Sequence, residues 1–517
     1  MNRRHFLQAA GLGAAAAAME SNLQGGERAI ERPNVLLIHA DQHRIGTLGC
    51  YGNRDVRTPH IDRLAAAGVR YENSFCPYPV CTPSRYSLLS GQYVHEHRGW
   101  SNRSTLAPGI ATFPKVLRAA GYRTRAVGKM HFTPTYLDVG FDELVLAEQD
   151  GPGRWDDDYH RYLMKRGLVD RNDLEDQRRE YRQRAPKVYW DTCGALVSNL
   201  PEEHHATTWA ADRAVETLRS WTPDAAHLLM VGFIKPHHPF DPPAPWHKTY
   251  DPAALALLPG WTQACFDHDL KLSRGYFPND QLSEESLRLA MAYYYATVSQ
   301  IDYHVGRMVA LLKQKGLYDN TLIIYTADHG EFMGFHHLLL KGNHLYDPLA
   351  KVPLVVKWPG RAPAGTLSKR LVNNIDLAPT ICRACGLSPA PSMRGQDLRD
   401  DGPGHDLIFA EAGRSQMMAR SRTRKLIQTA TNRADLFFDL EKDPLEMNNL
   451  YGSPDHRGEI EALEAALLKW RPPDTTFKGY HDENAPTIKG PNVPPRDLSH
   501  RPAIIEYYAK KMADLQC

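Results

Sequence analysis

Short, mostly apolar segments alternate with amphipathic segments along the chain from residue 33 onward. The apolar segments lie at residues 34–39, 122–127, 227–234, 321–326 and 352–358. Runs of this length without regular polar alternation are typical of strands that are buried on both faces of a sheet. Because helical patterns separate them, the sequence predicts an α/β fold: a large, mixed, mostly parallel sheet sandwiched by helices.

Capping residues and glycines mark the ends of three predicted helices. The helices begin after Thr58, Thr112 and Ser283, whose hydroxyls can accept a hydrogen bond from a free N–H of the first turn. Glycines near residues 68, 121 and 316 follow the three patterns and mark where the helices end.

The character of the chain changes past residue 400. Short strand patterns lie at residues 407–410, 425–428 and 436–440, and an amphipathic helix follows at 459–470. Strands this close together in sequence pair in an antiparallel manner, so we predict a smaller C-terminal antiparallel-sheet subdomain.

The composition is that of an ordinary globular protein. Apolar residues make up 42% of the 517 residues and charged residues 24%. The 62 lysines and arginines nearly balance the 60 aspartates and glutamates, so the net charge of +2 gives no general attraction to nucleic acid or to anionic membranes. Eight cysteines are too few for a disulfide framework, and Cys382 and Cys385 lie in one helical pattern, where we expect packed thiols.

The first thirty residues have the pattern of an export signal. Arg3 and Arg4 precede a run of alanine and glycine at residues 9–19, which is too short and too weakly apolar to span the roughly 30 Å of a membrane core. This pattern is typical of twin-arginine signals. We therefore expect export through the twin-arginine translocon to the periplasm or the outside of the cell, without a membrane anchor.

Two predicted strands end in residues that suit a metal ion. Asp41 and Gln42 follow the first strand, and Asp328 and His329 follow a later one. Because the carboxyl ends of parallel strands meet at one edge of a sheet, we expect these side chains to lie together. Carboxylate and amide oxygens with an imidazole suit a divalent cation such as Ca²⁺ or Mg²⁺, although an aspartate in this position is also a common helix cap.

Cys81 opens a further helical segment. Thr82 is predicted to cap this helix and Pro83 to occupy its first turn, which places Cys81 at the positive end of the helix dipole. That position favours an anion or a reactive thiolate, and an inert thiol is the alternative.

Residues 81–91 (CTPSRYSLLSG) and 121–131 (GYRTRAVGKMH) form two signatures, and residues 235–240 (KPHHPF), 328–330 (DHG) and His336 with Lys341 follow in order. In these segments the chain resembles the type I sulfatases of the alkaline phosphatase superfamily. The similarity spans residues 33–450. It implies hydrolysis of sulfate monoesters, and the substrate class expected from the family and from export is a sulfated carbohydrate.

The resemblance also implies a cofactor chemistry. In this family a maturation enzyme oxidises the signature cysteine, here Cys81, to formylglycine (3-oxoalanine), whose hydrate carries two hydroxyls on one carbon. One hydroxyl attacks sulfur, and loss of a proton from the other then releases sulfate and restores the aldehyde. One divalent metal ion would be held by Asp41, Gln42, converted Cys81, Asp328 and His329. Ca²⁺ is the ion we expect first, with Mg²⁺ or Mn²⁺ as alternatives.

The remaining matched residues would bind substrate and move protons. Arg85 and Lys129 would bind the hydrate, and sulfate oxygens would meet Lys129, His237 and Lys341, of which Lys341 or His237 would be the general acid. His131 would accept the proton that triggers release. Two points stay open: His238 is an alternative to His237, and His336 is either a substrate contact or a residue that orients a neighbour.

Departures from the common family pattern leave other functions open. Many relatives carry two aspartates where this chain has Asp41 and Gln42, and many carry asparagine in place of His329. Both variants occur within the superfamily, among them in choline sulfatase-like and phosphonate monoester hydrolase-like enzymes, so a hydrolase of phosphonate or phosphate esters is the second hypothesis. A catalytically silent protein that binds sulfated glycans is the third, and the presence of every expected polar residue counts against it.

The predicted division of the chain follows from these assignments. We expect the export signal at residues 1–30, a catalytic α/β domain at 31–400, an α+β subdomain at 401–475 and an extension packed on the surface at 476–517. The segments 148–205 and 239–282 lack clear strand patterns and are expected to be loops that set specificity.

Overall fold

The computed structural model describes residues 32–149, 155–177, 187–272, 282–360, 364–413, 415–429, 435–471, 479–482, 484–488 and 500–514. The predicted export signal at residues 1–30 lies outside the described residues, as do parts of the predicted segments 148–205, 239–282 and 476–517.

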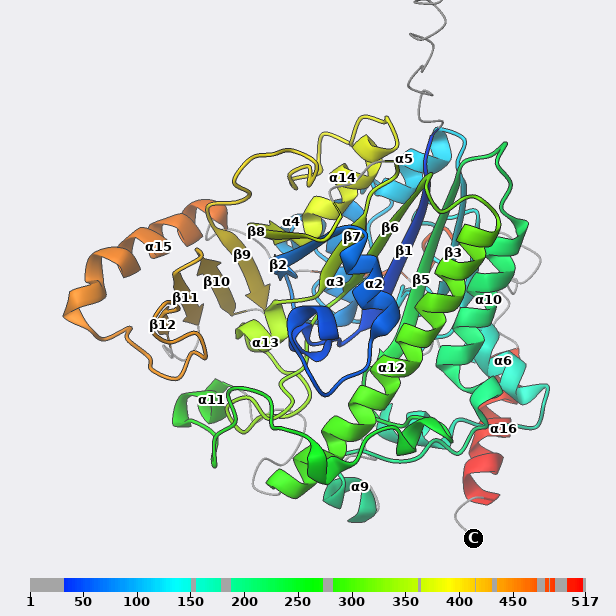
Figure 1. Ribbon diagram of the computed structural model, residues 1–517, viewed down its shortest axis with the longest axis horizontal. Coiled ribbons are helices and arrows are strands. Elements are labelled where there is room, and N and C mark those ends of the chain that lie inside the picture. The colour runs from blue at the N-terminus through cyan, green and yellow to red at the C-terminus, as the bar shows by residue number, and fades with distance from the viewer. Residues whose placement is uncertain are drawn as a thin grey trace, which may run out of the picture.

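An eight-stranded sheet forms the centre of the molecule, in the order β4-β3-β5-β1-β6-β7-β2-β8 (Figure 1). The strands are β1 (Asn34–Asp41), β2 (Val69–Phe75), β3 (Arg123–Gly128), β4 (Glu143–Leu146), β5 (His227–Pro236), β6 (Thr321–Ala327), β7 (Leu354–Lys357) and β8 (Thr366–Asn373). Only β7 runs antiparallel to its neighbours, β6 and β2, and the other pairings are parallel. The prediction of a mixed, mostly parallel sheet is therefore confirmed.

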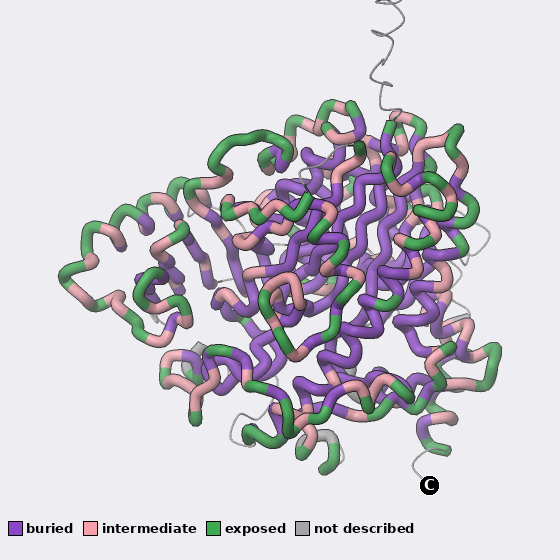
Figure 2. Tube along the Cα trace, in the orientation of Figure 1, coloured by how far each residue is buried: buried purple, intermediate pink, exposed green. Residues whose placement is uncertain are grey.

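Helices cover both faces of this sheet. One layer contains α2 (Pro59–Ala66), α10 (Ala206–Ser220) and α12 (Glu284–Gln314), and the other contains α3 (Cys81–Ser90), α5 (Phe113–Ala119) and α14 (Leu377–Ala384). Alternate residues of β1 divide between the two cores, with Leu36 and Ile38 in the first and Val35 and Leu37 in the second. All of β1 is buried as a result, and Figure 2 shows the central strands as a purple block.

The predicted helix starts are correct, but one predicted cap is wrong. The hydroxyls of Thr112 and Ser283 accept the N–H groups of Lys115 and Ser286 and so cap α5 and α12. Thr58 precedes α2 without capping it through its side chain. The Asp302 carboxylate of α12 instead accepts the N–H groups at positions 60 and 61, at distances between 2.7 and 3.1 Å.

A second, four-stranded antiparallel sheet has the order β12-β11-β10-β9, as predicted for the C-terminal region. Its strands are β9 (Ile408–Ala412), β10 (Gln416–Arg420), β11 (Arg424–Thr429) and β12 (Leu436–Asp439). The helix α15 (Arg457–Trp470) packs on it through Leu463 and Leu467 and lies to the left in Figure 1.

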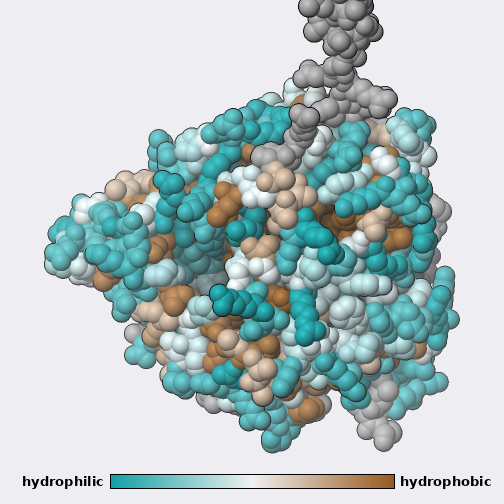
Figure 3. All heavy atoms as spheres, viewed as in Figure 1, coloured by the Kyte–Doolittle hydropathy of each residue, from teal (hydrophilic) through white to brown (hydrophobic). Residues whose placement is uncertain are grey.

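Shorter helices lie in the connections: α4 (Val94–His97), α6 (Asp158–Met164), α7 (Arg171–Gln177), α9 (Lys187–Asp191), α11 (Asp267–Leu272) and α13 (Asp347–Ala350). The last described helix, α16 (His500–Asp514), packs against α6 through Tyr508. Among the described residues, no helix combines the length and apolar character needed to cross a membrane. Polar residues cover most of the face seen in Figure 3.

Candidate active site

The candidate metal-binding side chains converge at the carboxyl ends of two neighbouring strands. Asp41 is the last residue of β1, and Asp328 and His329 directly follow β6, which pairs with β1. Gln42 has a positive φ of 61°, and its backbone N–H donates to Asp328 Oδ1 at 3.0 Å. This turn places Gln42, which follows β1, next to Asp328, which follows β6.

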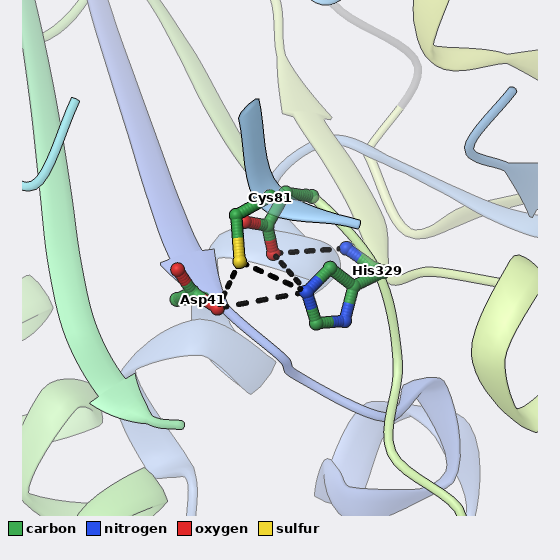
Figure 4. Close-up of side chains that lie close together, drawn as sticks. Asp41, Cys81 and His329 are labelled. Carbon is green, nitrogen blue, oxygen red and sulfur yellow. Dashed lines mark hydrogen bonds and ion pairs between the residues drawn. The ribbon is translucent and has the colours of Figure 1, made fainter. Parts of the chain in front are cut away.

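Cys81 lies at the first turn of α3 and points into this cluster. Its Sγ is 3.6 Å from Asp41 Oδ1 and 3.4 Å from His329 Nε2, and Figure 4 shows the three side chains facing one another. The helix begins at Cys81, with Val80 as the N-cap residue, so the prediction that Thr82 caps it is wrong. The hydroxyl of Thr82 donates instead to the backbone oxygen of His131, at 2.8 Å.

Arg85, one turn further along α3, connects both carboxylates. Its guanidinium donates to Asp41 Oδ2 and to Asp328 Oδ2, each at 3.1 Å, and to the backbone oxygen of Lys129 at 2.6 Å. All three charged groups are buried. Since an isolated buried charge is costly, Arg85 stabilises the two carboxylates in the positions that the strands give them.

Two lysines flank the cluster. Lys129, which follows β3, places Nζ 2.7 Å from Asp41 Oδ2 and 2.9 Å from Gln149 Oε1. Lys341, in the connection after β6, places Nζ 3.1 Å from Cys81 Sγ, 3.0 Å from His237 Nε2 and 3.2 Å from His329 Nε2. Lys129 of the second signature and Lys341 of the connection after β6 thus lie on the same site as Cys81.

The opposed charges shift the pKa values in the cluster. Burial and the Asp41 carboxylate raise the pKa of the Cys81 thiol, but the ammonium groups of Lys341 and Lys129 outweigh them and hold it well below its ordinary value. Burial also opposes the charged form of Asp41, yet the ammonium of Lys129 and the guanidinium of Arg85 keep the pKa of this carboxyl low. Burial and Lys341 lower the pKa of His237, so its ring is neutral at neutral pH.

The side chains of this cluster fit a divalent cation. Ligand atoms of Asp41, Cys81, Asp328 and His329 all lie within 4.8 Å of one another. The Gln42 amide donates through Nε2 to Glu331, and its buried Oε1 has no hydrogen-bond partner among the described residues. His329 Nδ1 lies 2.9 Å from the backbone oxygen of Gly330, and donation from Nδ1 leaves the Nε2 lone pair for a metal. An unpartnered oxygen and an oriented imidazole are the features expected of a metal site.

The structure treats the two remaining predicted histidines differently. His131 follows Lys129 by two residues in a left-handed conformation (φ 57°), and its buried Nδ1 has no hydrogen-bond partner among the described residues. His336 belongs to a separate buried cluster, where Nε2 lies 3.0 Å from the backbone oxygen of Leu445 and Nδ1 lies 3.4 Å from Asp269 Oδ2. Its contacts therefore favour a role in fixing the connection that carries Lys341.

Sequence reasoning missed three buried residues that support the site. Glu148 accepts the backbone N–H groups of Met130 and His131, Gln149 accepts a hydrogen bond from Lys129, and Glu331 accepts one from Gln42. The sequence could have indicated two of them. Glu148 and Gln149 come shortly after the carboxyl end of the parallel strand β4, and Asp41 was predicted because it lies at the carboxyl end of such a strand.

The comparisons agree with this geometry. The family model described as Sulfatase matches residues 33–387. The chain belongs to the sulfatase family. Like its relatives, it is a sulfuric ester hydrolase. The sulfatase is 28% identical to an arylsulfatase of Clostridium perfringens, over 91% of this chain and 99% of the relative.

Two further similarities are to a sugar sulfatase and to a phosphonate monoester hydrolase. The sulfatase is 26% identical to the N-acetylglucosamine-6-O-sulfatase of Bacteroides thetaiotaomicron, over 88% of each chain. Its fold is similar to that of the solved phosphonate monoester hydrolase from Silicibacter pomeroyi, with a TM-score of 0.70 and 23% identity over 85% of this chain and 95% of that one. This likeness shows that the two proteins share a fold.

Proposed function

We propose that this enzyme removes sulfate from a sulfated carbohydrate, with Cys81 converted to formylglycine and one divalent metal ion, Ca²⁺, bound beside it. The observation that carries the proposal is the convergence of Asp41, Cys81, Asp328 and His329 within 4.8 Å, with the ammonium of Lys341 3.1 Å from Cys81 Sγ. The carbohydrate part is supported by the similarity to an N-acetylglucosamine-6-O-sulfatase.

Five side chains would hold the metal: Asp41, Gln42, converted Cys81, Asp328 and His329. When bound, such an ion beside the formylglycine hydrate would supply a hydroxyl of lowered pKa as the nucleophile. Arg85 donates to Asp41 and to Asp328 and so would hold these two carboxylates in the positions in which they bind the ion.

The cations beside Cys81 would bind the sulfate group. Lys129 and Lys341 present buried positive charge, which stabilises the oxygens on which negative charge grows in the transition state. Lys341 and His237 lie 3.0 Å apart and can share the proton that the departing alkoxide needs. His131, with its free Nδ1, would accept the proton that accompanies release of sulfate.

The test is a screen of purified, matured protein against defined sulfated monosaccharides and disaccharides, with released sulfate measured. We expect release from a subset of these sugars. Mass analysis of the peptide that contains Cys81 should show the change from thiol to aldehyde, and an unmodified thiol in protein from the native host would count against the proposal.

The matched control is Cys81→Ala. This variant should lose turnover completely while its melting temperature stays close to that of the native protein, because the thiol contacts the polar side chains of Asp41, His329 and Lys341 and belongs to none of the main apolar clusters among the described residues. Retained activity would overturn the assignment of Cys81.

The second candidate function is hydrolysis of phosphonate or phosphate esters. Gln42 supports it, since an amide in place of a carboxylate lowers the negative charge of the metal site, and the fold is similar to that of a solved phosphonate monoester hydrolase. Steady-state rates on 4-nitrophenyl sulfate and on a 4-nitrophenyl phosphonate monoester distinguish the two: the faster substrate identifies the class.

Maturation and export form the last part of the proposal. The sequence around Cys81 is the segment that a formylglycine-generating enzyme would modify, and the twin arginines at positions 3 and 4 would direct the folded protein to the twin-arginine translocon. Replacing both arginines by lysine should leave the protein in the cytoplasm, as cell fractionation would detect.

A further inference from the structure

We infer that Gln149 is a positioning residue that aims both Lys129 and His237 at the substrate. Its side chain is fully buried and makes a hydrogen bond at each end. The inference rests on the substrate-binding roles proposed for Lys129 and His237.

The oxygen end of Gln149 sets the direction of Lys129. An ammonium group has three N–H donors. One donates to Asp41 Oδ2 at 2.7 Å and a second to Gln149 Oε1 at 2.9 Å. With two donors fixed, the direction of the third is fixed as well, and it is the donor that remains for a sulfate oxygen. Gln149 is neutral, so it orients the ammonium without cancelling its charge.

The nitrogen end of Gln149 reaches the other substrate-binding group. Gln149 Nε2 donates to the backbone oxygen of His238 at 2.8 Å, and the same oxygen lies 2.6 Å from His237 Nδ1. Donation from Nδ1 to this oxygen leaves the His237 Nε2 lone pair facing Lys341 Nζ, at 3.0 Å. Gln149 thereby fixes the carbonyl that selects the tautomer of His237.

A second contact anchors the amide. Gln149 Nε2 also donates to Asp173 Oδ1 at 2.7 Å, and Asp173 lies on α7, 24 positions further along the chain. Because Nε2 has carboxylate and carbonyl acceptors on its two N–H groups, and Oε1 has a cation, the amide has only one favourable orientation. The connection after β4 is in this way locked to the catalytic residues.

The first test replaces Gln149 by methionine, which keeps the length of the side chain and removes both polar ends. For Gln149→Met we expect kcat/KM on 4-nitrophenyl sulfate to fall by about 10- to 100-fold. The Kd for inorganic sulfate, measured by calorimetry on the matured protein, should rise in parallel. The matched control is Gln300→Met, which removes another fully buried amide, bonded to Thr208 on α10 away from the site.

The second test uses a charge that pH can remove. In Gln149→Glu, the ionised carboxylate would face Asp173 and the His238 carbonyl and would cancel the charge of Lys129, whereas the protonated carboxyl keeps the acceptor for Lys129 and one of the two donors of the amide. The activity of this variant relative to the native protein should therefore rise as the pH falls. If Gln149 only stabilised the fold, the ratio of the two activities would not change with pH over the range in which the melting temperature shows that the variant is folded.

The outcomes are separable. Absence of sulfate release by the native protein would contradict the proposed function, and the sulfate Kd would still test Gln149. If the native protein is active, the inference is overturned by any of three results: Gln149→Met within twofold of native in kcat/KM and sulfate Kd, an equal loss in Gln300→Met, or a pH-independent ratio for Gln149→Glu.

Discussion

The chemistry of the site depends on single side chains whose charges oppose one another at short range. Lys341 is the clearest case, since its ammonium lies within 3.2 Å of Cys81 Sγ, His237 Nε2 and His329 Nε2. The thiol and the Asp41 carboxylate outweigh burial and raise the pKa of Lys341, so the side chain stays protonated at neutral pH. A buried ammonium with this many acceptors can both bind sulfate and hold a proton for the leaving group.

Lys341→Ala should therefore affect substrates according to their leaving group. A sugar alkoxide needs a proton as it departs, whereas 4-nitrophenolate is stable without one, so we expect a loss of about 100- to 10,000-fold on a sugar sulfate and a much smaller loss on 4-nitrophenyl sulfate. The measurement is kcat/KM for both substrates, with formylglycine content checked by mass. Equal losses would assign Lys341 to binding alone.

Sequence reasoning identifies the residues at strand ends better than the residues that support them. Asp41, Asp328 and Cys81 are predictable because strand ends and a helix start bring them to one edge of the sheet. Glu331 is not, because its partner Gln42 is 289 positions away and only the folded chain joins them. For His336 the matched motif gives the position and leaves the role open, because the contacts of its side chain form only in the folded chain.

At the scale of elements, burial decides which strands the sequence reveals. The central strands β1, β5 and β6 are fully buried and read as apolar runs. The edge strand β8 alternates exposed and partly buried residues over its first half, and β2 contains Glu72 and Asn73, so neither was predicted. A search for apolar runs does not find strands that contain polar residues, whether the strand lies at the edge of the sheet, as β8 does, or beside the edge strand, as β2 does.

The cap of α2 also depends on a distant element, and it makes a prediction about pH. Burial raises the pKa of Asp302 from 3.8 to about 7, although the N–H groups of His60 and Ile61 oppose the shift. The folded protein therefore keeps a proton that the unfolded chain releases above about pH 4, and the resulting stabilisation is lost as the pH rises to about 7.

Asp302→Asn removes this titration and keeps an oxygen for the two N–H groups. The melting temperature of the variant, relative to the native protein, should increase between about pH 5 and pH 8. Differential scanning calorimetry at both pH values measures the difference. A difference that does not change with pH would show that Asp302 titrates normally.

At the scale of the whole molecule, a buried set of charges joins the two sheets. Lys425 of β11 donates to Asp347 of α13 at 2.9 Å and lies 2.6 Å from Glu446 Oε1, and Arg420 of β10 also pairs with Asp347. Asp347 and Lys425 are 78 positions apart, and neither belongs to a pattern that predicts the pairing. The C-terminal sheet was predicted correctly, whereas its attachment was not, because attachment depends on contacts between elements.

Lys425→Met should destabilise the protein strongly, since it leaves the buried carboxylate of Glu446 without its cation and removes one of the two cations that pair with Asp347, which keeps Arg420. We expect a loss of about 3–5 kcal/mol in the free energy of unfolding, seen as a lower melting temperature. The control is Lys442→Met, whose side chain is 84% exposed and lies 3.8 Å from Asp439, and which should change stability by less than about 1 kcal/mol. Similar effects for the two variants would show that the buried set contributes little.

Arg85 bears on the order in which the protein is assembled. Its guanidinium lies between the negative charges of Asp41 and Asp328 and offsets their mutual repulsion. The two carboxylates can therefore come together during folding without a bound ion. The ligand side chains are therefore already close together without an ion, and an ion can bind after folding. If the protein crosses a membrane already folded, as we propose, it can acquire its ion in either compartment.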